Sequence, residues 1–590
     1  MLHELVTYAD KHLTDSEPGF KTREVRWSIE LAADGRFLNI LPLGDGKRGT
    51  DLPRCPDMHG MNAGGKSHFL VESAQTVALL FKANEEQKKI DAAKIKHDFF
   101  VDLLKKATQS CQKLEALVQI LEDEGQLGAI RAKMAAHKAK PSDWVTWRID
   151  GRDPRLETEV QAWWRASRRT DPGKESTPTK PAGNAESTNA EAMVCLLTGL
   201  PTTPLPTHPK ISGLSGVGGL ATGDVMVGFD KAAFGSYGLY QSANAAMSAE
   251  AAQKYVDGLN DLIRNHTRKL ANTLVAHWYK DSLPPADDAL AFLVGMETDE
   301  QSEAAALGAV RRLLDAIRAG ERPDLADNHY YALTLSGAAG RVMVRDWMEG
   351  PFADLVSHIT AWFADLQIVA RDGNGNARDP KFMAVCGALV RDLKDLPAPT
   401  AATLWKVAIQ GLPIQQPLMA QALARFRTDL VDKDQPAFNH ARMGLIKAYF
   451  VRLKPGGNTI MTATYNPNHP AAAYHCGGLL ALFANLQRAA LGDVGAGVVQ
   501  RFYAAASQTP GLVLGRLAAN ARNHLAKLEP GLAWWYEERI AEIMSGLGDA
   551  APRILDLEGQ GLFALGYYQK LAQLRAGNKS TTDNTSQQGA

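Results

Sequence analysis

The stretch AAAYHCGGLLALFANLQRAAL (residues 471–491) carries apolar residues at the three- and four-residue spacing of a helix that packs on a core. Segments of the same kind flank it on both sides, separated by turns that contain proline or glycine. They occupy residues 381–393, 401–410, 419–431, 438–453, 498–507, 512–528, 532–547 and 557–574. Because no strand pattern interrupts this series beyond about Pro380, the sequence predicts an all-α C-terminal region, a helical bundle with short connections.

The first half of the chain mixes strand and helix patterns. A β-hairpin is predicted where residues 23–31 and 36–43 flank an Ala-Asp-Gly turn, because apolar residues alternate along the first segment. Helical periodicity follows from about Glu72 to Leu121 and returns over residues 248–266. Further strands are predicted at residues 144–150, 193–199, 224–229, 273–279, 330–337 and 341–347. Strands and helices alternate without a repeating βαβ unit, which predicts an α+β N-terminal region with irregular mixed sheets.

These patterns divide the chain into four predicted parts. They are an α+β region over residues 1–380, a helical connector over 381–460, a helical bundle over 461–576 and a disordered tail over 577–590. Residues 169–190 are rich in Pro, Ser, Thr, Gly and Asn and nearly free of apolar side chains. A segment of that composition cannot bury itself, so it is predicted to be a disordered insertion within the α+β region.

Composition excludes some classes of protein. The chain has 590 residues with 65 Lys plus Arg and 65 Asp plus Glu, so it lacks the basic excess of many nucleic-acid binders but can still carry a local basic face. No run of about 18 apolar residues is present, which excludes a transmembrane helix, and no membrane partner is expected. The N-terminus lacks the apolar segment of a signal peptide. Five scattered cysteines without a C-x-x-C pair indicate a reducing, cytoplasmic location.

A phosphate-loop pattern begins at Gly60 and ends in Lys66 and Ser67. A nucleotide-binding loop of this kind needs a buried strand before it and a helix after it. Residues 50–59 lead in with two prolines and no apolar run, and no apolar strand ending in Asp supplies a second magnesium ligand. A glycine-rich loop that carries one lysine is therefore favoured, and a P-loop enzyme built on Gly60–Ser67 remains the alternative.

Three further motif matches lack the flanking elements, ligand residues or spacing that their function requires. Residues 44–49 match G-x-G-x-x-G, but no helix is predicted after them, so a turn is favoured over a dinucleotide site. Residues 372–376 begin like a calcium loop, but the required glycine and glutamate are missing further on. His469, His475 and Cys476 match no zinc spacing and are expected to be a capping histidine and a buried helical pair. The sequence predicts no metal, no cofactor and no catalytic residue.

The middle block, residues 195–260, is dense in glycine and in polar loop residues. Those residues are His208, Lys210, Ser212, Ser215, Ser236, Tyr237, Gln241, Ser242 and Asn244. Glycine allows close backbone approach, and polar tips can contact phosphates, sugars or base edges. Composition alone favours the other interpretation, a set of turns that satisfy one another's hydrogen bonds.

In this block the sequence resembles a known family, the large subunit of the type I-C CRISPR surveillance complex, Cascade. The matching runs are residues 66–74, 195–199, 208–211, 228–248, 250–263, 330–347, 466–492, 532–544 and 561–570. They follow one another in order along nearly the whole chain, so the resemblance does not rest on one short motif.

The resemblance implies a non-catalytic subunit that recognises the protospacer-adjacent motif in double-stranded DNA and helps to unwind the target. Its implied partners are a guide RNA-bearing complex with backbone, RNA-processing and small subunits, the target duplex and its displaced strand, and a helicase-nuclease recruited after target binding. Guide pairing would read the sequence and leave the protein only a few base contacts. A purely architectural subunit, whose polar loops contact protein partners only, is a second alternative.

Seven residues are expected to sense the motif, because lysine and amide side chains suit the reading of base edges. They are Lys66, Ser67, Ser73, Lys210, Tyr237, Gln241 and Asn244. Two positions depart from the family pattern. Glu72-Ser73 stands where an acidic residue and Asn are expected, and Ser336-Gly337 stands where Pro-Asn is expected. If either amide reads bases in relatives, the DNA motif or its stringency is expected to differ here.

Two sets of residues are expected to hold the DNA backbone. Arg341 and Arg345 lie on one face of a predicted strand, where the competing interpretation is an internal ion pair. The second set forms a basic face for single-stranded DNA, with a merely solvated face as the alternative. It consists of Arg501, Arg516, Arg522, Asn523 and Lys527. The aromatic run 534–536 is expected to pack the bundle rather than to stack on bases.

The family also suggests a second product of the same gene. Type I-C loci commonly make their small subunit from an internal start, and Met461 opens the predicted bundle. Gly456-Gly457 lies just upstream, where glycine codons can spell a ribosome-binding sequence. Met461 is therefore the predicted internal start, and a purified complex without a small C-terminal fragment would count against it.

Overall fold

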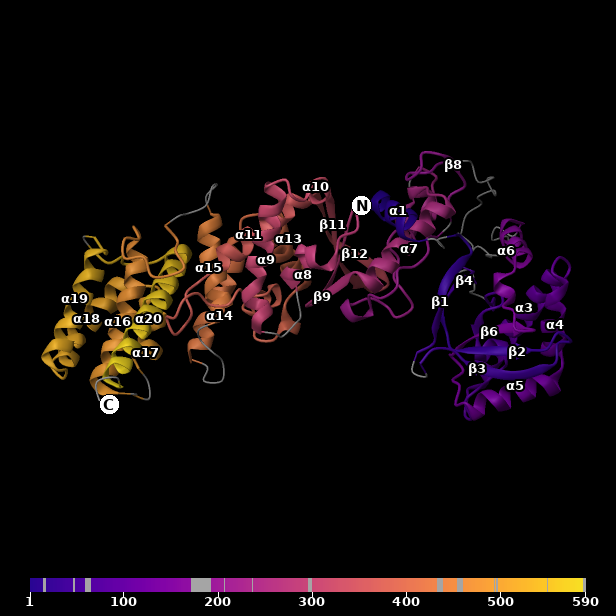
Figure 1. Cartoon of the computed structure of the whole chain (residues 1–590), viewed down its shortest axis with the longest axis horizontal. Helices are drawn as coiled ribbons and strands as arrows, with labels where there is room; N and C mark the ends of the chain where they lie inside the picture. Colours follow the sequence, from indigo (N-terminus) through magenta and orange to yellow (C-terminus); the bar gives the residue numbers. More distant parts are fainter. Residues whose placement is uncertain are drawn as a thin grey trace. The chain divides into compact units, whose positions relative to one another are not determined.

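A computed structural model describes most of the chain, and Figure 1 traces it from indigo to yellow. The described residues are 1–13, 17–45, 48–58, 65–170, 193–205, 207–235, 237–294, 300–431, 439–453, 460–492, 494, 497–548 and 550–586. For residues 168–170, 294, 300–306, 431 and 577–586 only the backbone is described. Residues 171–190 of the predicted insertion and 587–590 of the predicted tail lie outside the described residues.

The chain forms two compact units. Unit 1 comprises residues 1–213, 220–261 and 339–342, and unit 2 comprises residues 214–219, 262–338 and 343–590. The domain boundaries predicted from the sequence at residues 380 and 460 stay predictions.

Unit 1 contains a four-stranded mixed sheet in the order β3-β2-β6-β5. Its strands are β2 (Trp27–Leu31), β3 (Phe37–Pro42), β5 (Glu72–Ser73) and β6 (Trp144–Ile149). The predicted hairpin is confirmed, because β2 pairs antiparallel with β3, whereas β2 and β6 are parallel. A second ladder joins β1 (Phe20–Val25) to β4 (Thr50–Pro56). Helices α2 (Ala74–Val77), α3 (Gln87–Thr108), α4 (Glu115–Glu122), α5 (Glu124–Ala136) and α6 (Thr158–Thr170) accompany these strands.

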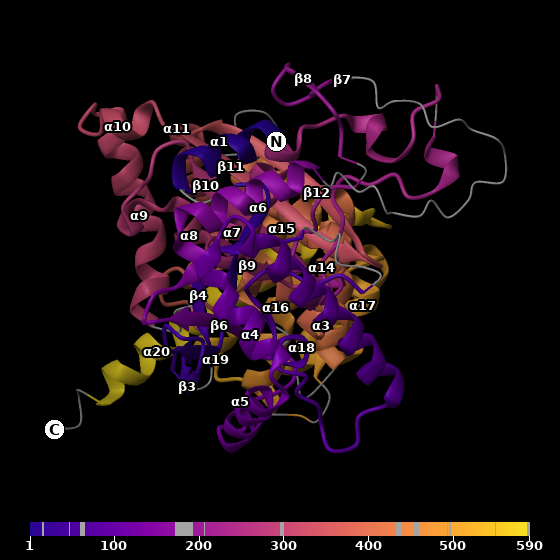
Figure 2. The same ribbon diagram turned by 90° about the vertical axis from the view of Figure 1, so that its right-hand side faces the viewer.

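The rest of unit 1 is built around two helices and long loops. The helices are α1 (Leu2–His12) and α7 (Ala249–Asn265), and the short strands are β7 (Met193–Val194) and β8 (Pro201–Thr202). The two helices pack closely, because a side chain at Gly258 of α7 would lie 2.6 Å from the Leu5 carbonyl oxygen of α1. Tyr8 also donates a hydrogen bond to Asp261 at 2.8 Å. Figure 2 shows that the segment after β7 is mainly loop.

Unit 2 begins with an antiparallel sheet in the order β12-β11-β10-β9. The strands are β9 (Thr267–Leu270), β10 (Thr273–Tyr279), β11 (His329–Ala338) and β12 (Arg341–Pro351), whose first two residues belong to unit 1. Helices α8 (Ala289–Val294), α9 (Glu300–Arg318), α10 (Pro323–Ala326) and α11 (Phe352–Leu366) belong to this part of the unit. The strands predicted at residues 273–279, 330–337 and 341–347 are thereby confirmed.

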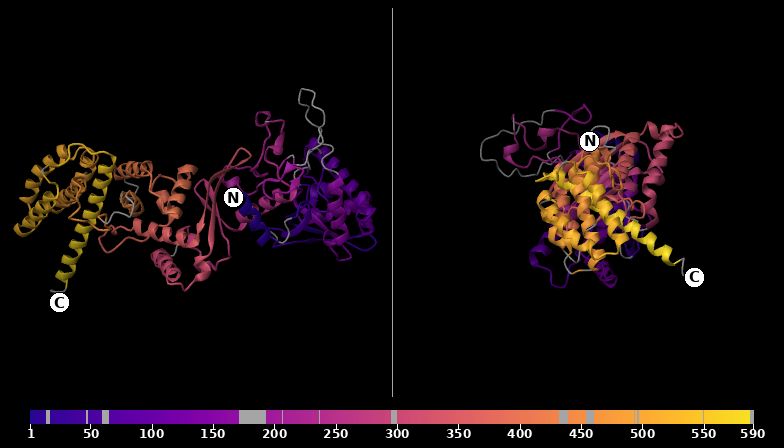
Figure 3. Two further views of the ribbon diagram at one scale, coloured as in Figure 1. Left: turned by 90° about the horizontal axis from the view of Figure 1, so that it is seen from above. Right: turned by 90° about the vertical axis from the view of Figure 1, so that its left-hand side faces the viewer.

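The C-terminal part of unit 2 is helical, as predicted. Its helices are α12 (Phe382–Gly387), α13 (Ala398–Gln410), α14 (Gln416–Val431), α15 (His440–Arg452), α16 (Ala472–Leu491), α17 (Val498–Ala506), α18 (Pro510–Leu525), α19 (Pro530–Ser545) and α20 (Leu557–Ser586). α20 is one long helix beside α16 and includes residues 577–586 of the predicted tail (Figure 3). One apolar core extends from Leu270 to Leu574, so the strands and helices of this unit bury their faces together.

Four local predictions were wrong. Residues 72–77 form β5 and one turn of α2 because Glu72 pairs with Val145 of β6, and helical structure resumes only at α3. Residues 224–229 form no strand, since the chain folds back so tightly that a Cβ at Gly228 would lie 2.7 Å from Val225. The strand predicted at 193–199 shrinks to β7, where a turn returns the Cys195 amide to the Leu200 carbonyl. The helix predicted at 381–393 ends at Gly387.

All five cysteines are buried and free. Within the described chain, no helix combines the length and the apolar character that membrane crossing requires.

Candidate nucleic-acid interface

The glycine-rich block of unit 1 is tied to the tip of the β11–β12 hairpin by backbone hydrogen bonds. The Val225 amide donates to the Gly340 carbonyl at 2.8 Å, and the Val342 amide donates to the Val225 carbonyl at 3.0 Å. Ile211 and Asp224 exchange a second pair of bonds at 2.8 Å, which closes the loop between them. Because backbone pairs are directional and hard to replace, these bonds fix residues from distant parts of the sequence next to one another.

A cavity of about 280 Å³ opens between these loops. It is lined by Thr207, His208, Val225, Val227, Gly228, Phe229, Asp230, Gln241, Ser242, Ala339, Gly340 and Arg341. The structure therefore brings together Gln241, predicted to sense the motif, and Arg341, predicted to hold the backbone. Lys210 and Asn244 lie on the same loops, and Lys66, Ser67 and Ser73 do not line the cavity.

His208 supplies a neutral polar wall to this cavity. Its Nδ1 lies 2.8 Å from the Tyr255 hydroxyl, and burial lowers the pKa of His208 to about 4. Its Nε2 is buried and has no hydrogen-bond partner among the residues that the structure describes. An unpaired buried polar atom costs about 1–3 kcal/mol, so a ligand that hydrogen-bonds Nε2 would recover that cost.

Arg341 is held in place at the mouth of the cavity. Its guanidinium forms an ion pair with Asp230 and lies 5.4 Å from the centre of the Phe234 ring. The internal ion pair that competed with the backbone-contact prediction is thus present. Both side chains are largely exposed, so the pair contributes little stability and leaves the guanidinium accessible to a phosphate.

Gln241 and Tyr237 both sit in the left-handed backbone region, with φ of 48° and 51°. A non-glycine residue held there costs of order 1 kcal/mol, and such residues occur often at binding sites. The Tyr237 side chain is 100% exposed. Asn244 positions the loop, because its Nδ2 donates to the carbonyls of Leu239 at 3.3 Å and Gln241 at 3.0 Å. That leaves the Asn244 amide oxygen for contact with a base.

Sequence reasoning missed three side chains of this loop. Phe234 is 40% exposed and Tyr240 is 72% exposed, which places two more aromatic rings beside Tyr237 on one segment. Asp230 was missed as the partner of Arg341. The spacing of aromatic residues among glycines between Gly228 and Gln241 was the available signal, because exposed rings are suited to stacking on bases.

The segment 66–73 belongs to the sheet-containing part of unit 1. Lys66 is half-buried, whereas Ser67 is fully buried, so its hydroxyl cannot contact DNA in this conformation. Ser73 donates to the Thr76 hydroxyl at 3.1 Å. The Glu72 carboxylate accepts hydrogen bonds from the backbone amides of His68 and Ser73. At the first departure from the family pattern, this carboxylate therefore holds the local turn in place.

The same segment lacks the architecture of a phosphate loop. Residues 59–64 lie outside the described residues, but no helix begins at Lys66 or Ser67, and the next helix starts at Ala74. Lys66 and Ser67 are therefore not presented by a helix N-terminus, which is what stabilises phosphate in such loops.

The second departure from the family pattern has a steric reason. A side chain at Gly337 would overlap the backbone of Gly218 and Gly219, so this strand end accepts only glycine while that loop passes it. Ser336 accepts a hydrogen bond from Arg345 Nε at 2.8 Å. Arg345 is exposed and has no ion pair within the described chain, which leaves its remaining donors for a phosphate.

Residues 5–575 match the family model described as CRISPR-associated protein (Cas_Csd1). The chain belongs to the CRISPR-associated Csd1 family. Members of this family are large subunits of type I-C CRISPR effector complexes, so the resemblance seen in the sequence is confirmed. The comparison with curated proteins gives no match.

In this Csd1-family chain the predicted basic face lies on α17, α18 and the turn after α18. Leu514, Leu517 and Ala521 bury the inner side of α18. Arg501, Arg516, Arg522, Asn523 and Lys527 are all exposed. None of the four cations forms an ion pair in the described part of the chain. These exposed cations are therefore accessible from solvent.

Two other predictions about the C-terminal region have mixed outcomes. Tyr536 is buried and Trp535 half-buried, as expected for packing, but Trp534 is 63% exposed, so for Trp534 the packing prediction was wrong. The capping role of His469 is confirmed, because its Nδ1 accepts from the Ala471 amide at the start of α16. His475 is buried one turn into that helix, as predicted.

Proposed function

We propose that this Csd1-family subunit is non-catalytic and recognises the protospacer-adjacent motif of double-stranded DNA through the cavity of unit 1. On this proposal it also helps to unwind the target for guide RNA pairing and supports recruitment of the helicase-nuclease. Its partners are the backbone, RNA-processing and small subunits of the guide-bearing complex, together with both strands of the target.

The observation that carries the proposal is the meeting of three kinds of group around one cavity. Gln241 offers an amide that can pair with a base edge, His208 offers a buried ring nitrogen without a partner, and Arg341 offers a cation for the backbone. Groove recognition combines such base contacts with phosphate contacts that set the register. Exposed Tyr237 and Tyr240 lie on the same loop.

The test is binding of the guide-loaded complex to matched duplexes that differ only in the flanking trinucleotide. Wild type is expected to prefer one set of flanks, and Gln241→Ala to reduce that preference about tenfold, because a bidentate amide-base contact is worth about 1–3 kcal/mol. Asn244→Ala is expected to act in the same direction, since Asn244 holds the carbonyls of Leu239 and Gln241.

Lys231→Ala on the same loop is the matched control. Lys231 is an exposed cation outside the cavity, so its loss should weaken binding to all flanks equally and leave their ratio unchanged. If Gln241→Ala keeps the full preference of wild type, these loops are structural, and the purely architectural alternative is favoured.

A second prediction concerns the basic face of α18. Arg516→Gln and Arg522→Gln are each expected to weaken binding of single-stranded DNA about twofold, because an exposed cation contributes modestly. Each should also lower the slope of log affinity against log salt by about 0.7, the value for one phosphate contact on a single strand. Anisotropy titrations at several salt concentrations measure both quantities. If a variant that carries both substitutions keeps the wild-type salt slope, these residues form only a solvated face and do not bind DNA.

The P-loop enzyme is the rival function. Nucleotide binding by the isolated chain, lost in Lys66→Ala, would favour it. The placement of Lys66 and Ser67 outside any helix start argues against it.

Internal translation from Met461 also remains a proposal. Met461 is buried, with its sulfur 3.3 Å from His469 Nε2, and Gly456-Gly457 lies outside the described residues. A mass spectrum of the purified complex, searched for a small C-terminal fragment, tests it.

A further inference from the structure

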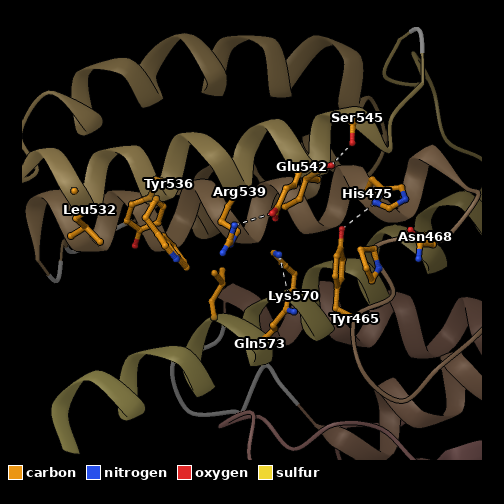
Figure 4. A pocket seen from close by; sticks show the side chains of 15 residues that line it. Tyr465, Asn468, His475, Leu532, Tyr536, Arg539, Glu542, Ser545, Lys570 and Gln573 are labelled. Carbon is orange, nitrogen blue, oxygen red and sulfur yellow. Dashed lines mark hydrogen bonds and ion pairs between the residues drawn. The ribbon is translucent and has the colours of Figure 1, made fainter. Parts of the chain in front are cut away.

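A pocket of unit 2 lies within the C-terminal bundle, and no residue of α18 lines it. Its volume is about 920 Å³, within the range of about 300–1,000 Å³ typical of ligand sites. α19 and α20 form its facing walls, and the segment 465–468 with His475 of α16 closes one end. Figure 4 shows the side chains that line it.

Lys570 of α20 is a buried cation without a carboxylate partner. Lys570 is only 5% exposed, and its ammonium donates a hydrogen bond to the Gln573 amide oxygen at 3.0 Å. It also lies 4.8 Å from the centre of the Tyr465 ring. Lysine is almost never fully buried unless an anion pairs with it. No carboxylate of the described residues forms an ion pair with Lys570, although the charge of Glu542 in the same pocket acts on it.

A second cation, Arg539 of α19, points toward Lys570 across the pocket (Figure 4). Arg539 Nη1 is bound to Glu538 at 3.0 Å and to Glu542 at 2.8 Å. Both carboxylates are therefore engaged by Arg539, so Glu542 stabilises the Lys570 charge without a direct ion pair. Burial lowers the pKa of Lys570, the charge of Glu542 opposes that effect, and the charge of Arg539 adds to it. An anion seated beside Lys570 would relieve both the desolvation and the repulsion.

The remaining walls are suited to a planar ring. Trp535 is half-buried, with the Arg539 guanidinium 5.4 Å from its ring centre. Asn468 and Gln573 place exposed amides at the rim. A buried cation for a phosphate, an aromatic ring for stacking and amides for polar edges are the three elements of nucleotide binding. A carboxylate from a protein partner would use the first element only.

We infer that this pocket binds a nucleotide, with its phosphate on Lys570 and its base against Trp535. The recognised chemistry is a phosphate joined to a planar base, which a single DNA strand and a free mononucleotide both carry. The inference rests on the proposed function only in that the subunit meets single-stranded DNA. It does not depend on motif sensing by unit 1.

The test measures binding of labelled oligo-dT of about 15 nucleotides by the purified full chain, between about 50 and 200 mM salt. Lys570→Met keeps the length of the side chain and removes the buried charge, so the fold is retained. It is expected to weaken binding about tenfold and to lower the salt slope by about 0.7. Lys269→Met, which removes an exposed lysine of β9, is the control and should bind like wild type.

A second measurement needs no variant. Oligonucleotides with 5-iodo-deoxyuridine are photo-crosslinked to the wild-type chain, and the modified peptides are mapped. Crosslinks within residues 532–545 or 465–475 support the pocket. Crosslinks confined to other peptides, or a Lys570→Met variant that binds with the affinity and salt slope of wild type, would overturn the inference.

Competition separates the two sources of the nucleotide. Displacement of the oligonucleotide by dTMP at comparable concentration assigns the pocket to a free nucleotide, whereas resistance to dTMP assigns it to a strand, and both results support nucleotide binding. If Lys570→Met does not weaken oligonucleotide binding, flank discrimination by the guide-loaded complex is unaffected. If Gln241→Ala does not reduce flank discrimination, binding of the oligonucleotide by the full chain is unaffected, so the two outcomes are distinguishable.

Discussion

Gly566→Ala is expected to destabilise the C-terminal helices by about 3 kcal/mol, the upper range for overpacking a well-packed core. A Cβ at Gly566 of α20 would overlap the carbonyl oxygen of Tyr474 in α16. In the reverse direction, a Cβ at Gly477 of α16 would overlap the carbonyl oxygen of Phe563 in α20. The atoms that a side chain would meet are backbone, which cannot rotate away, so the two helices must separate.

Separation of α16 and α20 would expose Phe563 and Tyr567, which are almost wholly buried at this crossing. Hydrogen exchange of the peptides that cover α16 and α20 measures the loss of protection. Gly515→Ala is the matched control, because nothing lies within 4 Å of a Cβ at that exposed position of α18. That variant should gain up to about 1 kcal/mol, the preference of a helix for alanine over glycine. Equal protection in Gly566→Ala and wild type would contradict the tight crossing.

Lys447→Met is expected to raise the stability of unit 2 by about 2 kcal/mol near neutral pH. Lys447 of α15 is buried, and its ammonium donates to the Asp365 carbonyl of α11 at 2.7 Å. Burial lowers the pKa of Lys447 from 10.5 to about 8, a penalty of about 3 kcal/mol on the charged form. Methionine removes that penalty and gives up one hydrogen bond, worth about 1 kcal/mol.

The pH dependence gives the sharper test of Lys447. The unfolded chain holds the lysine proton more tightly than the folded chain, so stability from this group rises with pH between about 8 and 10.5. The penalty is about 3 kcal/mol near pH 7 and about 1 kcal/mol near pH 10. The stability advantage of Lys447→Met over wild type should therefore shrink as the pH rises through this window.

Urea unfolding of the two proteins across that pH range, followed by tryptophan fluorescence, measures the difference between them. Other groups that titrate in the same range cancel in that difference. Lys269→Met is again the control, since an exposed lysine should change stability by less than about 0.5 kcal/mol at every pH. A difference between Lys447→Met and wild type that stays constant with pH would contradict a buried, charged Lys447.

Local patterns in the chain were enough to predict the class of the fold and the family. Helices such as α16 and α18 and the hairpin β2–β3 follow from the spacing of apolar residues, which is a property of neighbouring positions in the chain. The block 195–260 was recognisable because glycines and polar side chains stand close together in sequence. Gln241 was identified as a DNA-contact candidate in this block, and Arg341 from its position on the face of a predicted strand.

Which of these residues meet depends on how distant segments of the chain pack together. Val225 joins the hairpin tip through backbone bonds and so places Arg341 beside Gln241 and His208, a contact that no local pattern encodes. Glu72 lies in a strand and not in the predicted helix because it pairs with β6. Packing of the surrounding segments buries Ser67. Burial and partner choice depend on contacts between distant segments, which is why Lys570 facing Arg539 could be found only in the folded chain.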